Sequence, residues 1–454
     1  MSVTVTFELT KDFLDRLRVA IEEMDSTFIL SCLEGVNPAD ITAILFELDT
    51  AESKYVFDLL EAEVCGDILI ELDDETREEF LKNFTTEQIA VFVDQMDSDD
   101  GADLLMDLEL QKRETIIGEM RNEQRATHIL DLLRYDEDVA GGLMAKELIK
   151  ANINWNVLQC IDEIRKQTEH VDKIFSVYVV DDEDRFLGKV SLKKIILSHD
   201  KVKVADIYDK DIPSVESYVS NRDIAQIMQK YDLESIPVIN ARGKLVGRIT
   251  IDDIIDVITE LAEEERQLMS GIISDVEEDD SIWELSKARL PWLVIGMFGG
   301  LMAAQITDLF SADIKLITGL ALFIPLIMAT AGNVGIQSSS IVLQSLATKN
   351  AFADGMVKRL VKVLLVAVLN GLVLAVLVFG SILLIFQDQS LSLTVSMALF
   401  SVVLLSSFMG TVTPLILNNF NINPALASGP FITTANDLLG LAVYFSIAHV
   451  LYGL

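Results

Sequence analysis

Five long apolar stretches occupy the last third of this chain. They cover residues 292–309, 316–346, 361–386, 393–417 and 426–451. A helix needs about 20 apolar residues to cross the hydrocarbon core of a bilayer. The pattern therefore predicts an α-helical transmembrane domain with five spans over residues 290–454.

Residues 1–136 follow a different pattern. In ADITAILFELD the apolar residues Ile41, Ile44, Leu45 and Leu48 recur at helical spacing. The stretches EQIAVFVDQMD and GADLLMDLELQ repeat this spacing after short breaks of Asp, Ser and Thr, which are favoured N-caps. Short amphipathic helices in series predict an all-α superhelical domain over residues 1–136.

Residues 137–260 contain an internal repeat. The sequence VYVVDDEDRFLGKVSLKKII, which starts at Val177, aligns without gaps on IPVINARGKLVGRITIDDII, which starts at Ile236. In each copy an alternating β-branched run gives way to helical spacing, which predicts strand, turn, strand and helix. Two α/β units are expected, over residues 137–200 and 201–260.

A charged segment follows the repeat. Residues 261–289 are rich in acids, including Glu264 and Glu265. Their pattern predicts one long helix that connects the first 260 residues rigidly to the first membrane span. An ordinary solvated linker helix would have the same composition.

Charge divides the chain into two parts. It has 71 acidic and 36 basic residues, which give a formal net charge of -35. Acids and bases cancel within residues 291–454, so the negative charge belongs to residues 1–290. A region with this much negative charge repels nucleic acid and attracts cations. We expect cations as partners and no nucleic acid; a merely solvated acidic surface is the simpler alternative.

Flanking charges predict the orientation in the membrane. Lys287 and Arg289 precede the first span and four more bases separate the second from the third, whereas the opposite side carries Lys315 with three acids. By the positive-inside rule, residues 1–290 are cytoplasmic and Leu454 is outside. The N-terminus lacks the pattern of a signal peptide, and the three cysteines form no CxxC pair. A multi-pass protein of the cell membrane, surrounded by lipid, is expected.

One carboxylate, Asp437, lies deep in the last apolar stretch, in GPFITTANDLLG. An ionised Asp at the bilayer centre costs roughly 2.5–3.5 kcal/mol, so such a residue usually faces a partner, a cavity or an ion. Asp437 is therefore the leading candidate for an ion site. The alternative is a cap or first-turn residue of a helix that begins near Asn436.

Polar residues and helix breakers surround this acid in the sequence. Gly332, Asn333 and Gln337 predict an interruption of the second span, and Pro424 and Gly429 predict irregular backbone just before the last one. Irregular backbone at membrane depth is tolerated where it lines a cavity. Two broken helices and one buried acid predict an ion pathway. The residues expected to line it are Gly332, Gln337, Gly429, Pro430 and Thr434, with Asn333 as a neutral ligand.

Membrane enzymes are excluded by their chemistry. A membrane metalloprotease needs a His-Glu-x-x-His helix, and the four histidines of this chain form no such pair. An intramembrane aspartyl protease needs two acids in the membrane core, and only Asp437 is deep in an apolar stretch. We expect no enzymatic activity.

The order of these parts resembles the MgtE family of magnesium channels over nearly the whole chain. The motifs RLPWL from Arg289, AGNVGIQSS from Ala331 and NPALASGPFITTANDLLG from Asn423 carry the resemblance. It implies a homodimer with a Mg²⁺ pore between the subunits and Asp437 at the filter. It also implies that cytoplasmic Mg²⁺ binds the acidic domains and closes the pore.

The resemblance implies further metal-binding residues. Glu264 and Glu265 match the acids of the connecting, or plug, helix, and Asp99 and Asp100 match an acidic pair of the N-terminal domain. Asn423 stands where the family usually has Asp before Pro, so a cation site there is expected to be weaker or absent. The same architecture could carry Mn²⁺ or Co²⁺, but no Cys, Met or His cluster for softer metals surrounds Asp437.

The internal repeat resembles a tandem of cystathionine-β-synthase (CBS) modules, which in many proteins bind adenine nucleotides. Gly247, Thr250 and Asp253 match the G-x-x-T-x-x-D pattern of that site in the second copy, whereas the first copy has Lys194 in place of the Asp. The resemblance implies at most one ATP-type site. An N-cap on the following helix explains the same residues.

Overall fold

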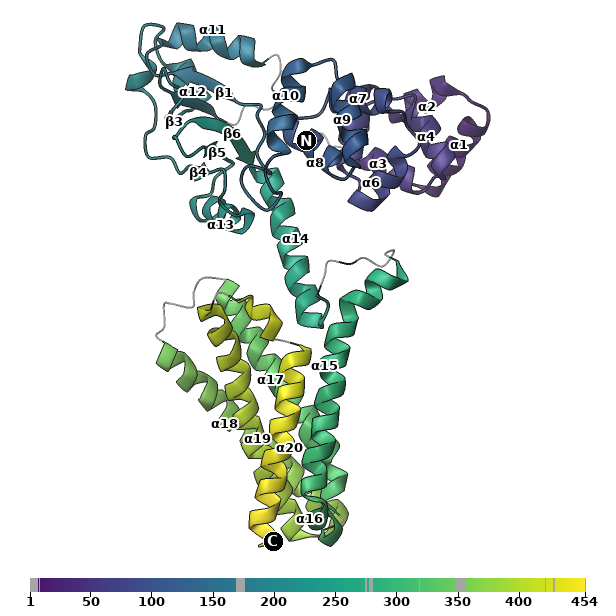
Figure 1. The fold of residues 1–454 in the computed structure, drawn as a ribbon, viewed down its shortest axis with the longest axis vertical. Coiled ribbons are helices and arrows are strands. Elements are labelled where there is room, and N and C mark those ends of the chain that lie inside the picture. The colour runs from purple at the N-terminus through teal and green to yellow at the C-terminus, as the bar shows by residue number, and fades with distance from the viewer. Residues whose placement is uncertain are drawn as a thin grey trace. The chain divides into compact units, whose positions relative to one another are not determined.

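The structure is a computed structural model that describes residues 7, 9–168, 176–273, 276, 281–317, 319–347, 356–420, 422–427 and 429–453. The chain forms two compact units, Met1–Ile258 and Thr259–Leu454. Figure 1 labels most of the helices and strands of both units. Each unit is described by itself.

The first unit begins with the helical domain that the sequence predicts. Its described helices are α1 (Lys11–Glu22), α2 (Ser26–Leu33), α3 (Pro38–Phe46), α4 (Thr50–Phe57), α5 (Ala62–Ile70), α6 (Asp74–Leu81), α7 (Thr86–Val93), α8 (Ser98–Met106), α9 (Leu110–Glu119) and α10 (Glu123–Leu132). The predicted break before EQIAVFVDQMD supplies an N-cap, because Thr85 caps α7 in a capping box, as Asp49 does for α4. The break before GADLLMDLELQ places Asp97 at the N-cap of α8, but its side chain makes no capping hydrogen bond. Apolar positions such as Ile44, Ile68 and Ile89 are fully buried between the helices.

Two α/β modules complete the first unit. The first consists of β1 (Ile149–Asn152), α11 (Val157–Gln167), β2 (Val177–Val180), β3 (Phe186–Val190) and α12 (Leu192–Leu197). The second consists of β4 (Val215–Glu216), α13 (Asn221–Tyr231), β5 (Ser235–Ile239), β6 (Leu245–Thr250) and the start of α14 (Ile251–Ser270), with a short 3₁₀ turn (Val204–Asp206) between the modules. The predicted repeat is confirmed as two modules of one topology.

The two sheets have the same pairing. Each has three strands in sequence order, with a parallel pair followed by an antiparallel pair. Gly188 pairs with Val179 in the first module, and Gly247 pairs with Val238 in the second. The glycines that superimpose in the sequence therefore occupy equivalent positions in the two sheets.

The connecting segment differs from the single helix predicted over residues 261–289. Helix α14 starts at Ile251, inside the second module, and stops at Ser270, while the next helix starts only at Ile282. Gly271 has φ +82°, its N–H bonds to the Leu268 carbonyl, and the Ile272 N–H bonds back to Gln267. This pattern is a Schellman end, which stops a helix where glycine supplies the left-handed residue. Residues 274–275 and 277–280 of the predicted helix lie outside the described residues.

Within its described residues, the second unit contains five helices long and apolar enough to cross a membrane. They are α15 (Ile282–Leu309), α17 (Ile324–Ala347) with its preceding 3₁₀ turn (Leu320–Phe323), α18 (Met356–Phe386), α19 (Gln389–Asn419) and α20 (Pro430–Tyr452). A short helix, α16 (Ser311–Leu316), follows α15, and a 3₁₀ turn (Pro424–Ala427) precedes α20. The predicted number of spans agrees with the described structure.

The predicted break inside the second span is wrong. Helix α17 runs without interruption through Gly332 and Gly335. Glycine within a helix costs only about 1 kcal/mol relative to alanine, and both glycines lie against side chains of α20. They allow close helix packing rather than a change of direction.

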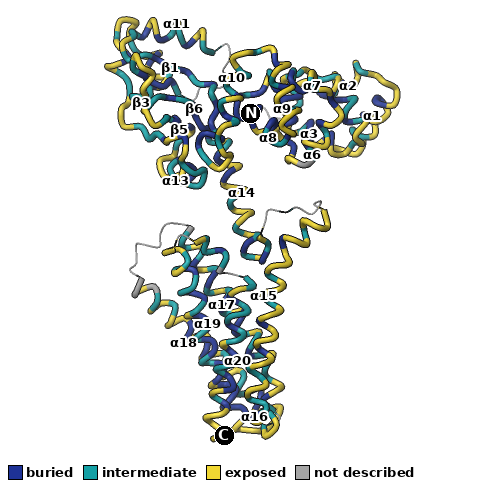
Figure 2. Tube along the Cα trace, viewed as in Figure 1, coloured by how far each residue is buried: buried dark blue, intermediate teal, exposed yellow. Residues whose placement is uncertain are grey.

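Helix α19 is the centre of this bundle. In the most apolar 18-residue stretch of α19, 61% of the residues are buried, compared with 11% in the corresponding stretches of α15 and α18. Figure 2 shows the same contrast along the tube. In a single chain, α15 and α18 therefore present much of their surface to the surroundings.

Candidate functional site

Asp437 lies two turns inside α20, which begins at Pro430. The alternative that it caps a helix starting near Asn436 is therefore wrong, because its backbone is in the helix interior. Its side chain is partly exposed in the single chain. A carboxylate so placed gains little from the positive end of the helix, since that effect fades within the first turn.

Helix α17 leaves space for this carboxylate at Gly332. A Cβ added to Gly332 would lie 3.4 Å from Asp437 Oδ1 and 3.0 Å from Thr433 Cγ2. Gly332 is buried and packs against the side chains of Asp437 and Thr433. The structure thus brings Gly332 of the second span close to Asp437 of the last span.

Two amides lie beside this contact on the open side of α17. Asn333 and Gln337 are exposed and follow Pro325 and Ala329, also exposed, at intervals of four residues. Residues four apart share one face of a helix. Exposing an amide side chain to the hydrocarbon of a bilayer is energetically unfavourable, so polar side chains in a membrane span usually face water or protein. We define the pore stripe as Pro325, Ala329, Asn333 and Gln337.

The sequence did not single out Asn436, the residue before the acid. Its side chain is fully buried, and neither its oxygen nor its nitrogen has a hydrogen-bond partner within the described residues. A Cβ on Gly335 would overlap the Asn436 amide nitrogen. Gly332 and Gly335 of α17 thus receive the two adjacent polar side chains of α20.

Gly429 and Pro430 lie where the connecting helix meets the last span. A Cβ on Gly429 would overlap the carbonyl oxygen of Met269, and a Cβ on Gly271 would lie 2.6 Å from Pro430 Cγ. Gly429 has φ +61°, a value that glycine adopts without strain. The end of α14 and the start of α20 therefore pack tightly within the second unit.

Two other predicted residues are engaged in local contacts. The Asn423 side-chain oxygen accepts the Ala425 N–H at 3.0 Å and so starts the 3₁₀ turn before α20. Thr434 packs on α15, where a Cβ at Gly299 would overlap its methyl group. Both side chains are partly exposed.

An acidic cluster lies in the first unit, between α8 and the start of α14. Burial first, and the neighbouring carboxylates Asp100, Asp253 and Asp97 next, raise the pKa of Asp99 well above its usual value. Burial first, and then Asp97, Asp253 and Asp103, raise the pKa of Asp100 to about 8. Burial also raises the pKa of Asp253. Asp99 and Asp100, predicted as a pair, are thus joined by Asp253, which the sequence indicated only for a nucleotide. We call Asp97, Asp99, Asp100 and Asp253 the acidic cluster.

The described side chains of this cluster are not arranged to coordinate a cation directly. Asp99 is 9% exposed, and its Oδ1 has no hydrogen-bond partner among the described residues. Within the same residues no three acidic, histidine or cysteine side chains are arranged to hold a metal ion directly. Mg²⁺ keeps several of its waters when it binds proteins, so it can bridge carboxylates that do not touch it all at once.

Glu264 and Glu265 lie on the second half of α14, within the second unit. Glu264 is exposed and Glu265 is partly exposed. Helix α14 itself begins in the first unit, where it carries Asp253. One helix therefore carries one member of the acidic cluster and the predicted plug acids.

The residues of the predicted nucleotide site contact one another. The N–H and hydroxyl of Thr250 donate to Asp253 Oδ2 at 2.8 and 2.7 Å. A Cβ on Gly247 would lie 2.7 Å from the Met144 sulfur and 2.9 Å from the Ala145 carbonyl oxygen. In the first module Lys194 pairs with Asp209 at 2.6 Å. These contacts agree with the structural alternative of a helix cap, and a nucleotide would have to compete with them.

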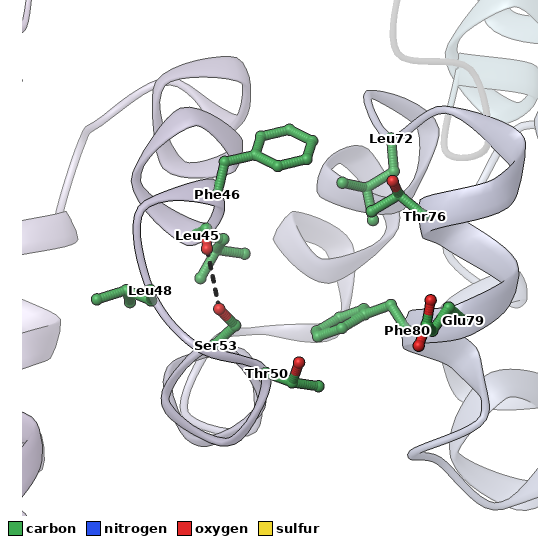
Figure 3. A pocket seen from close by; sticks show the side chains of 9 residues that line it. All are labelled: Leu45, Phe46, Leu48, Thr50, Ser53, Leu72, Thr76, Glu79 and Phe80. Atoms are coloured by element: carbon green, nitrogen blue, oxygen red, sulfur yellow. Dashed lines mark hydrogen bonds between the residues drawn. The ribbon is translucent and has the colours of Figure 1, made fainter. Parts of the chain in front are cut away.

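A pocket of about 230 Å³ lies in the helical domain (Figure 3). Its lining residues are Leu45, Phe46, Leu48, Thr50, Ser53, Leu72, Thr76, Glu79 and Phe80. The Ser53 hydroxyl within it donates to the Leu45 carbonyl at 3.0 Å. The pocket is mainly apolar, and no residue predicted to bind an ion or a nucleotide lines it.

Comparison with known proteins finds relatives along the whole chain. A family of divalent cation transporters matches residues 324–447, the MgtE intracellular N domain matches residues 36–138, and the CBS domain matches residues 138–198 and 204–260. The Magnesium transporter MgtE of Enterococcus faecalis is 32% identical over 332 residues, which is 72% of each chain. That of Thermus thermophilus is 28% identical over 96% of this chain and 97% of its own.

A solved structure resembles the first part of the chain. The cytosolic domain of the Mg²⁺ channel MgtE in complex with ATP covers 54% of this chain and 99% of its own, with 27% identity and a TM-score of 0.51. The relatives above and the five apolar helices among the described residues agree with this similarity. The chain belongs to the MgtE family, whose members are divalent cation transporters and not enzymes.

Proposed function

We propose that this protein carries Mg²⁺ across the cell membrane through a pore at which Asp437 binds the ion. The contact of Asp437 with Gly332, beside the pore stripe, carries this proposal. A carboxylate supplies charge, while the amides of Asn333 and Gln337 supply neutral oxygens that bind weakly. An ion that must leave as well as enter needs such a combination.

The pore forms between two copies of the chain. The pore stripe is exposed in the single chain, and a second copy would enclose it and place two Asp437 carboxylates opposite one doubly charged ion. The CBS modules support the same assembly. Ile196 and Leu197 of α12 are 74% and 75% exposed, and Ile255, the counterpart of Ile196 in the second module, is 56% exposed. Apolar residues exposed at equivalent positions are typical of a surface that another subunit covers.

Cytoplasmic Mg²⁺ closes this pore through the acidic cluster. Four carboxylates gathered between α8 and α14 repel one another, and a divalent cation bound among them relieves that repulsion. Helix α14 carries Asp253 at one end and meets Gly429 and Pro430 at the other. Binding at the cluster therefore acts on the helix that contacts the start of the Asp437 span. In this arrangement residues 1–290 are in the cytoplasm and the C-terminal end of α20 is outside.

Flux through purified protein tests the proposal. Proteoliposomes loaded with a Mg²⁺ indicator are compared for the native chain, Asp437→Asn, and Asp308→Asn as a control that removes an exposed acid near the end of α15. Loss of Mg²⁺ entry in Asp437→Asn alone is expected. Equal flux in all three proteins would remove Asp437 from the conduction path. Replacing Mg²⁺ with Mn²⁺ or Co²⁺ in the same vesicles tests the second candidate, a carrier of another divalent cation.

An adenine nucleotide is a second ligand to test. The similarity to a cytosolic domain solved with ATP supports it, although Thr250 and Asp253 are bonded to each other here. Calorimetric titration of ATP into the full chain, with Asp253→Asn as the variant, gives heat in the native protein alone if this site binds nucleotide.

A further inference from the structure

The N-terminus of α8 has an unusual cap. Asp97 occupies the N-cap position, yet its side chain makes no capping hydrogen bond. The Ser98 N–H instead donates to Glu147 Oε2 at 3.1 Å, and the Ser98 hydroxyl donates to the same oxygen at 2.6 Å. Glu147 lies 49 residues further along the chain, just before β1. A residue of the CBS region thus caps a helix of the helical domain.

Both partners are withdrawn from water. Ser98 is fully buried and Glu147 is 8% exposed. Burial alone raises the pKa of Glu147, but His128, whose Nδ1 lies 3.7 Å from Oε1, and the Ser98 donors outweigh it and lower the pKa to about 2. Hydrogen bonds to an ionised acceptor are about twice as strong as neutral ones.

Neighbouring contacts fix the backbone on either side of this pair. The Lys146 N–H donates to Ser98 Oγ at 2.9 Å, and its ammonium pairs with Asp131 of α10 at 2.5 Å. Ala145 exchanges two backbone hydrogen bonds with Arg248 of β6, at 2.8 and 2.9 Å. Residues 145–147 therefore join the second CBS sheet to two helices of the helical domain.

We propose that the Glu147–Ser98 pair is a metal-independent clasp that holds α8 against the CBS modules and so positions Asp99 and Asp100 beside Asp253. The inference rests on the proposed regulation by Mg²⁺ and names a positioning residue for it. Asp99 and Asp100 directly follow Ser98 in α8, so the clasp sets where the acidic cluster forms. With the clasp in place, less Mg²⁺ is needed to complete docking.

The sign of the effect separates this role from simple charge repulsion. Glu147 is itself negative and contributes to raising the pKa of Asp99. If it were only one more repelling carboxylate, Glu147→Gln would make docking easier and lower the Mg²⁺ requirement. A clasp predicts a higher Mg²⁺ requirement, because Glu147→Gln removes the negative charge that accepts the two hydrogen bonds from Ser98.

Limited proteolysis of the full chain in lipid nanodiscs measures this. The Mg²⁺ concentration that half-protects residues 1–258 is compared for the native protein, Glu147→Gln, Ser98→Ala and the double variant, with Glu163→Gln of α11 as a matched loss of one negative charge. We expect each single variant to need about tenfold more Mg²⁺. The double variant should need no more than either single one, because both remove the same interaction.

The rate of digestion in EDTA measures the stability of the clasp in the absence of Mg²⁺. Both single variants should be digested faster than the native protein under this condition. A native protein with no Mg²⁺-dependent protection would refute the proposed regulation, while the EDTA rates would still decide the clasp. An unchanged or lower Mg²⁺ requirement in both variants, or additive effects in the double variant, would overturn the clasp alone. Circular dichroism confirms folding, and Ser98→Ala serves if Glu147→Gln does not fold.

Discussion

The carbonyl oxygen of Met269, at the end of α14, fills the space that a side chain on Gly429 would need. Gly429 immediately precedes α20, and Asp437 follows two turns later. The helix that leaves the second CBS module therefore packs on the start of the helix that carries the candidate ion ligand. Within the second unit, the end of α14 and the start of α20 therefore approach each other backbone to backbone.

Gly429→Ala should weaken the closing of the pore by Mg²⁺. The new Cβ overlaps Met269 and also requires φ +61° of a residue with a side chain, which costs roughly 1–3 kcal/mol. Flux measured in proteoliposomes at rising internal Mg²⁺ checks this. Gly300→Ala, at an open position of α15, is the control and should close normally. Normal closing in Gly429→Ala would show that the contact does not transmit the signal.

Gly335→Ala should destabilise the membrane domain, because the new methyl group overlaps the buried Asn436 amide. Overpacking of this kind costs about 1–3 kcal/mol. Thermal unfolding in detergent, with Gly380→Ala as a control at an open position, measures it. Adding Asn436→Ala should restore most of the loss. No rescue in the double variant would mean that Asn436 is not the group that makes alanine unacceptable at 335.

Docking of the helical domain without Mg²⁺ should depend on pH. The pKa values of Asp99 and Asp100 are raised, that of Asp100 to about 8, mainly by burial. A raised pKa favours docking when the groups are protonated, so this contribution is complete below their ordinary pKa near 4 and is lost as pH rises through about 8. Spin labels on the helical domain and on the CBS modules should report a larger docked fraction at pH 6 than at pH 9 in EDTA, while the Glu147–Ser98 clasp acts at both pH values.

Millimolar Mg²⁺ should reverse the separation at pH 9, where the carboxylates are free to bind it. At pH 6 protons compete with the ion, so more Mg²⁺ is needed to fill the cluster. The variant Asp99→Asn/Asp100→Asn should remain docked at both pH values. Separation that increases as pH falls would contradict the assignment of these carboxylates.

Substitution of the exposed isoleucines should weaken the dimer. Ile196→Glu and Ile255→Glu place charges at equivalent positions of α12 and α14, where a partner would otherwise bury them. Sedimentation of the detergent-solubilised chain should show more monomer for each variant, and most for the double variant. Asp162→Lys, on α11, changes charge without changing apolar surface and is the control. Unchanged sedimentation would move the interface elsewhere.

The sequence determined the identity and order of the elements. Apolar runs of bilayer length fixed the five spans, helical spacing with Asp and Thr caps fixed the helical domain, and the repeat from Val177 and Ile236 fixed two modules of one topology. These features are local or repeat at known intervals, so they can be read without knowing what packs against what. Asp437 stood out for the same reason, as one charge within an apolar run.

Packing partners were decided only by the tertiary structure. The glycines of the second span predicted a broken helix, but α17 is continuous and Gly335 receives the Asn436 amide. The sequence indicated Asp253 only as a nucleotide ligand, and it gave no sign of a role for Glu147. In the structure Asp253 lies near Asp99, and Glu147 accepts hydrogen bonds from Ser98. Whether a glycine bends a helix or admits a neighbour, and which carboxylates share a site, depends on residues distant in sequence. Their proximity is a property of the fold alone.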